Sequence, residues 1–391
     1  MHSFRSCLLP LLVSMLFIPP VFADGSGPDD REGLYMPRDI RRAYERGTRG
    51  WNGAPGVSYW QNAADYRIRV TVHPDTRLLV GEETITYHNN SPDTLRRLVL
   101  KLHQNMNRAG AARCSPLGAK AVTDGVRLSA LTVDGIDRNR FPGSEEATID
   151  GGNLIVTLPR PLAPKSSIDI TAAWDFIIPV TTGEGGGNPR MGAYENGAIF
   201  VAYWYPKVAV YDDVHGWDMH SYDGEHEFYN DYGAMDVEIT VPDRYGVWAT
   251  GSLDNPEDVL REPYLSRYRT ALVSDTVVRI INEAEAAAAG GMKPGAVWRF
   301  RATSVPDFAF GIARGYCWDG VSADNGIGRV FVDAAYDPAA TSFATVAAEA
   351  KETVEMMSRA RPGVPFPYPA MKAWRTSFPS TCRINSQTTT I

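Results

Sequence analysis

Hydrophobic and polar residues alternate with a period of two over several stretches of this chain. Residues 66–72 (Tyr-Arg-Ile-Arg-Val-Thr-Val) alternate strictly, and residues 79–88 alternate again after the turn at 73–76. Such alternation is typical of antiparallel strands that bury one face and expose the other. Many short strands at regular spacing indicate a mainly β fold, either a sandwich or a large curved sheet. Further strands are expected at residues 98–102, 126–133, 154–158, 168–173, 235–241, 277–281, 298–302 and 329–333.

A helical period is clearest near the end of the chain. Between residues 342 and 360, apolar residues recur at three- and four-residue steps, which predicts a helix with one apolar stripe. Shorter segments at 39–46 and 282–289 are compatible with a short helix, and the second also with a solvated loop. The stripe of the long helix consists of Phe343, Val346, Ala347, Ala350, Val354 and Met357.

The segment 199–251 is rich in Trp, Tyr and Phe, and its middle is acidic. Alternating stretches at 199–204 and 235–241 flank that middle, so a strand is expected on each side. Three of the seven histidines lie in it, at His215, His220 and His226. No two of them are four residues apart, and the run His-Glu-Phe-Tyr-Asn at 226–230 ends on Asn where a zincin motif needs a second His. Polar loop residues are therefore expected here, not metal ligands.

Composition excludes one class of partner. The chain has 391 residues, of which 44% are hydrophobic and 22% charged, as in globular proteins of two or three domains. The formal net charge is −7, and no basic stripe is present, so nucleic acid is not an expected partner. A glycine cluster at 183–187 lacks the strand and helix that flank a phosphate-binding loop, and a flexible loop is expected there.

Residues 1–23 read as a secretory signal peptide. Arg5 supplies the charged start, residues 8–18 form an apolar run, and Val-Phe-Ala at 21–23 offers a cleavage site. The run is too short for a good membrane span, so we expect export to the periplasm or the extracellular space, without a stable span after cleavage. An uncleaved anchor is the alternative. Cleavage would leave Cys114, Cys317 and Cys382, which are interpreted as structural.

Several motifs follow one another in the order of a known family. They are YWQNAADYRIRVTVHPDTRLLVGEETITYHNNSPDTLRRLVLKLHQN from residue 59, WYPKVAVYDDVHGWD from 204, EFYNDYGAMDVEITVP from 227, WATG from 248, VPDFAFGIARGYCWD from 305 and PFPYP from 365. Together they resemble the N-terminal part of an aminopeptidase N-type (gluzincin) zinc metallopeptidase of the bacterial type. The likeness begins near Tyr59 and stops after Met371.

The resemblance implies a domain organisation. Residues 24–58 would be a polar lead-in, and 59–304 the family's large, saddle-like antiparallel β-domain. Residues 305–371 would be the first strands and helix of an α+β catalytic domain, incomplete because the family's zinc-binding motif comes later. Residues 372–391 are polar and match nothing in the family, as in a chain cut short or shifted out of frame.

The family's catalytic machinery has no counterpart in this sequence. His-Glu-x-x-His and the Glu that follows it in the family do not occur, so no catalytic residue, no metal ligand and no cofactor are predicted for this chain. His73, His88 and His103 fall in or beside predicted strands and are expected on solvated faces. Gly-Ala-Tyr-Glu-Asn at 192–196 looks like the family's exopeptidase motif, but it lies far upstream of that motif's place and is interpreted as coincidence.

One substrate contact of the family falls within the chain. The family's β-domain lends the active site a Gln just before the Trp-Tyr-Pro segment, and Tyr203 stands at that place. Because a Tyr replaces that Gln, the role of the Gln does not carry over to this chain. Tyr203 and Trp204 are still candidate substrate-binding residues that line a cleft, with core packing as the equal alternative.

Two functional hypotheses remain open. In the first, the chain is the N-terminal part of an exported, aminopeptidase-like zinc metallopeptidase that acts on peptides, and it is inactive by itself because it lacks the zinc ligands. In the second, it is a non-catalytic β-domain that binds a peptide, a glycan or a partner protein. Residues 305–371 favour the first, because sequence from the start of a catalytic domain has no reason to occur alone.

Overall fold

The structure, a computed structural model, describes residues 35–138, 146–181, 191–288, 291–360 and 370–375. The expectations for the signal peptide (1–23), the glycine cluster (183–187), the PFPYP motif, Cys382 and most of the polar tail concern residues outside these ranges. Two compact units divide the chain between Tyr59 and Trp60. In the first unit, helix α1 (Arg38–Glu45) confirms the short helix expected at 39–46, and the Tyr44 and Trp51 rings stack with centroids 4.0 Å apart.

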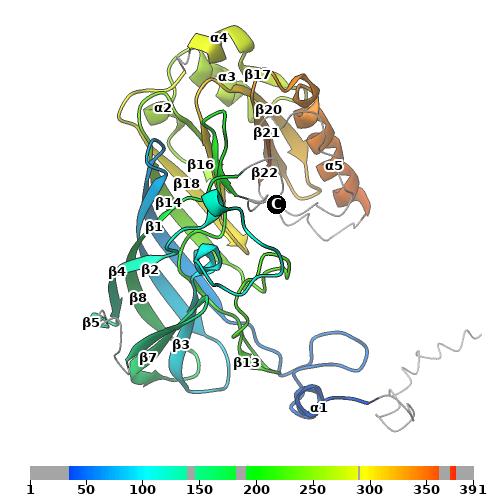
Figure 1. Ribbon diagram of the computed structural model, residues 1–391. Coiled ribbons are helices and arrows are strands. Elements are labelled where there is room, and N and C mark those ends of the chain that lie inside the picture. Colours follow the sequence, from blue (N-terminus) through cyan, green and yellow to red (C-terminus); the bar gives the residue numbers. More distant parts are fainter. Residues whose placement is uncertain (1–34, 139–145, 182–190, 289–290, 361–369, 376–391) are drawn as a thin grey trace, which may run out of the picture. The chain divides into compact units, whose positions relative to one another are not determined.

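The second unit is mainly β, as predicted, and its largest sheet has eight strands (Figure 1). Every pairing in this sheet is antiparallel except that of β1 with β14, which is parallel. In spatial order the strands are β16 (Ser252–Leu253), β18 (Val297–Val305), β14 (Gly233–Thr240), β1 (Ala63–His73), β2 (Leu78–Asn89), β8 (Ser166–Ile177), β4 (Arg127–Val133) and β5 (Ile136–Asp137).

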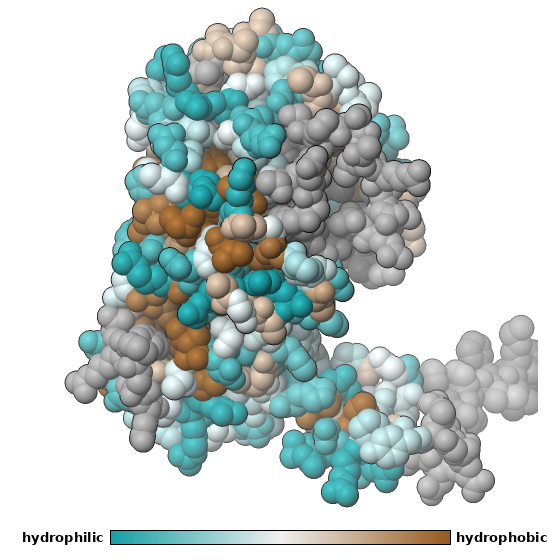
Figure 2. Space-filling view, in the orientation of Figure 1, coloured by the Kyte–Doolittle hydropathy of each residue, from teal (hydrophilic) through white to brown (hydrophobic). Residues whose placement is uncertain are grey.

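The predicted alternation along β1 is confirmed. Tyr66, Ile68, Val70 and Val72 are buried, whereas the residues between them are exposed or half-buried. A strand that buries every second side chain gives the sheet one core face and one wet face. Figure 2 shows hydrophobic residues gathered in the middle of the face in view, over the strands labelled β14, β1 and β2 in Figure 1.

The described residues of this unit form three further sheets of four strands and the small pair β12 (Tyr211–Asp212) and β13 (Gly216–Trp217). The first contains β11 (Lys207–Val208), β3 (Leu95–Lys101), β7 (Asn153–Leu162) and β6 (Ala147–Asp150). The second contains β15 (Gly246–Ala249), β19 (Phe310–Ala313), β10 (Ile199–Val201) and β9 (Gly192–Ala193). The third contains β17 (Val278–Ile281), β20 (Cys317–Asp324), β21 (Arg329–Tyr336) and β22 (Ala370–Arg375).

Helices gather around the third of these sheets. Helix α5 (Val346–Ala360) packs against β20 and β21, and α3 (Tyr264–Ala271) contacts the same sheet through Tyr268, whose ring lies 5.4 Å from that of Trp318. The remaining helical segments are short: α2 (Pro256–Val259), α4 (Glu283–Ala288), and the 3-10 turns η2 (His103–Asn107), η3 (Ala119–Ala121) and η4 (Thr341–Phe343). Helix α4 corresponds to the segment at 282–289 that was compatible with a helix or a loop.

The long helix begins four residues later than predicted, at Val346, because 341–343 form a 3-10 turn. Its buried face consists of Ala347, Ala350, Val354 and Ser358. Met357 was expected in the stripe but is 39% exposed. At 3.6 residues per turn, Met357 points about 65° away from the centre of that face, at its edge, and its side chain is partly open to solvent. No helix within the described ranges is long and apolar enough to span a bilayer.

Candidate functional site

Tyr203 follows β10 and lies in a cluster of aromatic rings. Its backbone φ is 41°, in the left-handed region, and only 5% of its surface is exposed. Its ring lies 4.9 Å from that of Phe228, 5.5 Å from Tyr222 and 6.4 Å from His103. We refer to these four residues as the His103 cluster. The Tyr203 side chain is therefore part of the packed interior, directly after the end of β10.

His103 is buried, which corrects the expectation of a solvated strand-face histidine. It is 8% exposed at the start of η2, and its Nε2 has no hydrogen-bond partner among the described residues. Burial, reinforced by the positive charges of Lys207 and Lys101, lowers the pKa of His103 to about 3. The imidazole is therefore neutral at physiological pH and packs as an aromatic ring.

Trp204 is a core residue that joins two distant parts of the chain. It is 1% exposed, and its indole Nε1 donates a hydrogen bond to the carbonyl oxygen of Phe308 at 2.9 Å. Its own carbonyl oxygen accepts from Trp174 Nε1 at 3.1 Å. The two residues proposed to contact substrate are therefore both buried in this structure, and that role stays a prediction.

Two buried lysines border the same segment, and the sequence reasoning missed both. Lys101 is 4% exposed, and its Nζ donates to Asn153 Oδ1 at 3.0 Å and to the carbonyl oxygens of Asp218 and His220 at 2.7 and 2.9 Å. An ion pair with the Asp218 carboxylate at 3.0 Å completes its contacts. Burial lowers the pKa of Lys101. The Lys101 ammonium group thereby connects the acidic loop, at Asp218 and His220, with strands β3 and β7.

Lys207 is the second buried lysine, also 4% exposed. Its Nζ donates to the carbonyl oxygen of Pro306 and lies 3.8 Å from Asp307 Oδ1. Burial lowers its pKa, against the opposing charges of Asp307 and Asp231. The sequence did contain a signal for this residue, namely a lysine inside an otherwise apolar run. Burying an ammonium group is costly unless it is hydrogen-bonded or paired with a carboxylate, so such a lysine predicts buried partners.

A small cavity lies between β1 and the segment around Lys207. Its volume is about 10 Å³, and the residues with polar side chains that line it are Tyr66, Tyr87, Lys207, Asp231 and Tyr232. Burial raises the pKa of Asp231 to about 6. A space of this size holds about one water molecule, so the cavity suits a buried water rather than a substrate.

The three histidines of the acidic middle do not meet. His215 Nδ1 lies 3.9 Å from Asp212 Oδ2, while His226 Nδ1 lies 2.6 Å from Asp223 Oδ2. Within the described ranges, no two of these histidines belong to one group of potential metal ligands. The Gly-Ala-Tyr-Glu-Asn run forms β9 and the turn into β10, where Asn196 Nδ2 donates to Tyr316 Oη at 3.0 Å.

The zinc centre of the family that the sequence resembles does not fit this chain. Such a centre needs two histidines of a His-Glu-x-x-His helix, a further Glu and an open position for water. The full sequence contains no such motif. No step of peptide hydrolysis is therefore assigned to these residues.

Comparisons with known proteins give matches among solved structures only. No model of a known protein family and no curated protein matches the sequence. The M1 zinc metallopeptidase from Deinococcus radiodurans matches with 15% identity and a TM-score of 0.45 over 82% of this chain. A mutant of that enzyme bound to a Tyr-Ser-Ala substrate matches with 16% identity and a TM-score of 0.46, also over 82% of this chain. The present chain spans 58% of the length of the second structure.

Proposed function

We propose that this chain carries the N-terminal β-domain (59–304) and the start of the catalytic domain (305–371) of an exported, aminopeptidase-like zinc metallopeptidase. Peptides are the substrate class of the whole protein in this proposal. In this proposal the 391 residues perform no zinc-dependent peptide hydrolysis by themselves, since they contain no His-Glu-x-x-His motif.

The observation that carries this proposal is that motifs far apart in the sequence pack on one another. The Tyr66 and Tyr205 rings meet edge to face with centroids 5.3 Å apart. Tyr205 Oη donates to Asp307 Oδ1 at 2.8 Å, and Trp204 Nε1 donates to the Phe308 carbonyl. Strand β14, from the EFYNDYGAMDVEITVP motif, pairs directly with β1. Residues from motifs that occur in the family's order thus form one buried network. This supports a shared architecture rather than a chance resemblance of separate short motifs.

The test is an activity assay on the purified chain. Aminoacyl anilides are incubated with the protein in the presence of Zn²⁺ and, in parallel, with a chelator. We expect no hydrolysis above the buffer rate in either arm. Hydrolysis that the chelator abolishes, and that scales with protein concentration through a second chromatographic step, would contradict the proposal.

A further inference from the structure

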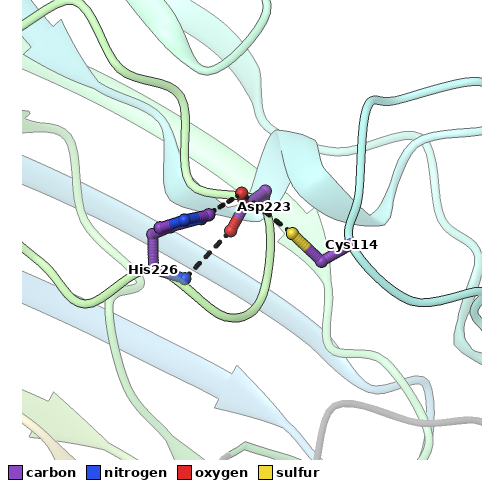
Figure 3. Close-up of side chains that lie close together, drawn as sticks. All are labelled: Cys114, Asp223 and His226. Atoms are coloured by element: carbon purple, nitrogen blue, oxygen red, sulfur yellow. Dashed lines mark hydrogen bonds and ion pairs between the residues drawn. The ribbon is translucent and has the colours of Figure 1, made fainter.

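Three side chains from two loops, one of them in the acidic middle of the segment 199–251, converge on one point (Figure 3). Cys114 lies between η2 and η3, while Asp223 and His226 follow β13. Asp223 Oδ2 lies 3.1 Å from Cys114 Sγ and 2.6 Å from His226 Nδ1. All three potential ligand atoms lie within 4.8 Å of one another. Cys114 is an exposed free thiol, unlike the structural cysteine expected, whereas Cys317 is buried.

Backbone hydrogen bonds hold the two loops in this arrangement. The Cys114 amide donates to the Asp223 carbonyl oxygen at 3.1 Å, which joins the loops directly. Asp223 Oδ1 accepts from the amides of Glu225 and His226, both at 3.1 Å. The carboxylate is therefore oriented by main-chain groups, and its second oxygen is left to face the thiol and the imidazole.

The donor set matches a borderline-soft metal ion. A thiolate sulfur, an imidazole nitrogen and a carboxylate oxygen are the three ligand types that Zn²⁺ takes in proteins. Tetrahedral zinc with bonds of about 2.0–2.3 Å sets its ligand atoms about 3.3–3.6 Å apart. The observed 2.6 and 3.1 Å separations from the Asp223 oxygen need an opening of less than about 1 Å, while the sulfur and the nitrogen already lie within 4.8 Å of each other. His226 can make this movement because its side chain is 82% exposed.

We propose that Cys114, Asp223 and His226 bind one divalent transition-metal ion, with Zn²⁺ preferred, and leave an open coordination position toward solvent. The metal replaces the protons that the three groups now share, and it ties the loop at 114 to the loop at 223–226. This site is separate from the hydrolytic centre of the resembled family, which needs residues this sequence lacks. Its test is also separate, because the cobalt titration reports metal binding whereas the anilide assay of the proposed function reports hydrolysis.

The experiment titrates the full, metal-free protein with Co²⁺, which reports a bound thiolate through its ligand-to-metal absorption band. We expect the band to saturate at one equivalent and to disappear when Zn²⁺ is added. Cys114→Ser abolishes the band, and His226→Asn weakens Zn²⁺ binding, measured by calorimetry, at least about tenfold. His215→Asn is the matched control, an exposed histidine of the same segment outside the cluster, and it leaves binding unchanged.

Circular dichroism and melting of the metal-free variants establish that they fold like the parent chain. Three results would overturn the proposal: no saturable Zn²⁺ binding, a cobalt–thiolate band that survives in Cys114→Ser, or equal weakening by His215→Asn and His226→Asn. The first means that the trio is only a hydrogen-bonded turn. The other two place the metal at different residues.

Discussion

The carboxyl group of Glu83, on β2, is buried without a hydrogen bond from any described residue to offset its loss of hydration. The residue is 4% exposed, and neither carboxylate oxygen has a hydrogen-bond partner among the described residues. Burial raises the pKa of the Glu83 carboxyl well above its ordinary value of 4.5. The folded state therefore keeps the proton to a higher pH than the unfolded state does. Folding free energy is lost as the pH rises above 4.5 toward the folded-state pKa.

Replacing Glu83 by Leu removes this cost. We expect Glu83→Leu to raise the free energy of unfolding by roughly 1–3 kcal/mol at pH 7, because two unsatisfied buried oxygens are lost. The gain is smaller at pH 4, where the carboxyl is protonated in both states. Urea denaturation of both proteins at both pH values measures it.

Glu82 provides the control for this change. Its side chain is 61% exposed and pairs with Arg69 at 3.2 Å on the wet face of β2. Glu82→Leu should change stability by no more than about 1 kcal/mol, since exposed ion pairs contribute little. A gain in Glu83→Leu that is the same at pH 4 and pH 7 would show that its carboxyl does not titrate on unfolding.

The sequence did not predict the surroundings of residues whose contacts are far away in the chain. Cys114 and Asp223 stand 109 positions apart, so no spacing rule brings them together. His103 was expected in solvent because its neighbours read as a strand, yet the fold places it among three aromatic rings. Sequence patterns report the local period of burial, whereas a cluster of ligands or rings is set by tertiary packing.

At the scale of elements, α5 lies against its sheet through small side chains. Ala347 is 1% and Ala350 7% exposed on the face toward β20 and β21. Small residues at such a contact let a helix approach closely, and the space between the layers is filled. The position is therefore sensitive to added volume.

Ala347→Leu tests this contact. We expect it to destabilise the protein by roughly 1–3 kcal/mol, because the larger side chain forces the helix away from the strands. Glu352→Leu places the same side chain on the exposed face of the same helix and should change stability by less than about 0.5 kcal/mol. Thermal unfolding followed by circular dichroism compares the two. Similar melting temperatures for both variants would mean that the face is loosely packed.

The sequence pattern predicted the strands that bury only one face. The stretches at 66–72 and 79–88 became β1 and β2, because each buries one face and so keeps a period of two. Strand β20 was missed, since seven of its eight residues are buried and such a strand has no alternation to detect. The parallel pairing of Tyr66 with Met235 joins positions 169 apart and is a property of topology, not of either strand.

At the scale of the unit from Trp60 onward, the chain that follows residue 305 passes directly from one sheet into another. Strand β19 (Phe310–Ala313) lies between β15 and β10 in one sheet, while β20, four residues later, lies in another. Phe308 just before it accepts the Trp204 hydrogen bond. The boundary proposed between the β-domain and the catalytic domain is therefore crossed by hydrogen bonds, and the two parts are expected to fold together.

Shortened chains test this dependence. Residues 60–304 lose the middle strand of the β15–β19–β10–β9 sheet, whereas residues 60–375 keep it. We expect cooperative thermal unfolding for the longer chain, and for the shorter one a lower, broader transition with binding of a hydrophobic dye. A sharp transition at the same temperature for both chains would show that residues 60–304 are an independent folding unit.

The position of β19 also bears on behaviour at high concentration. Strand β19 pairs with β15 and β10, which come earlier in the sequence. If β19 detaches by local opening, the β19 strand of a second molecule can form the same pairings in its place. Reciprocal exchange of this segment would then link copies into dimers or chains without any new surface being made. Concentrated solutions warmed just below the melting temperature should favour such exchange over amorphous precipitation.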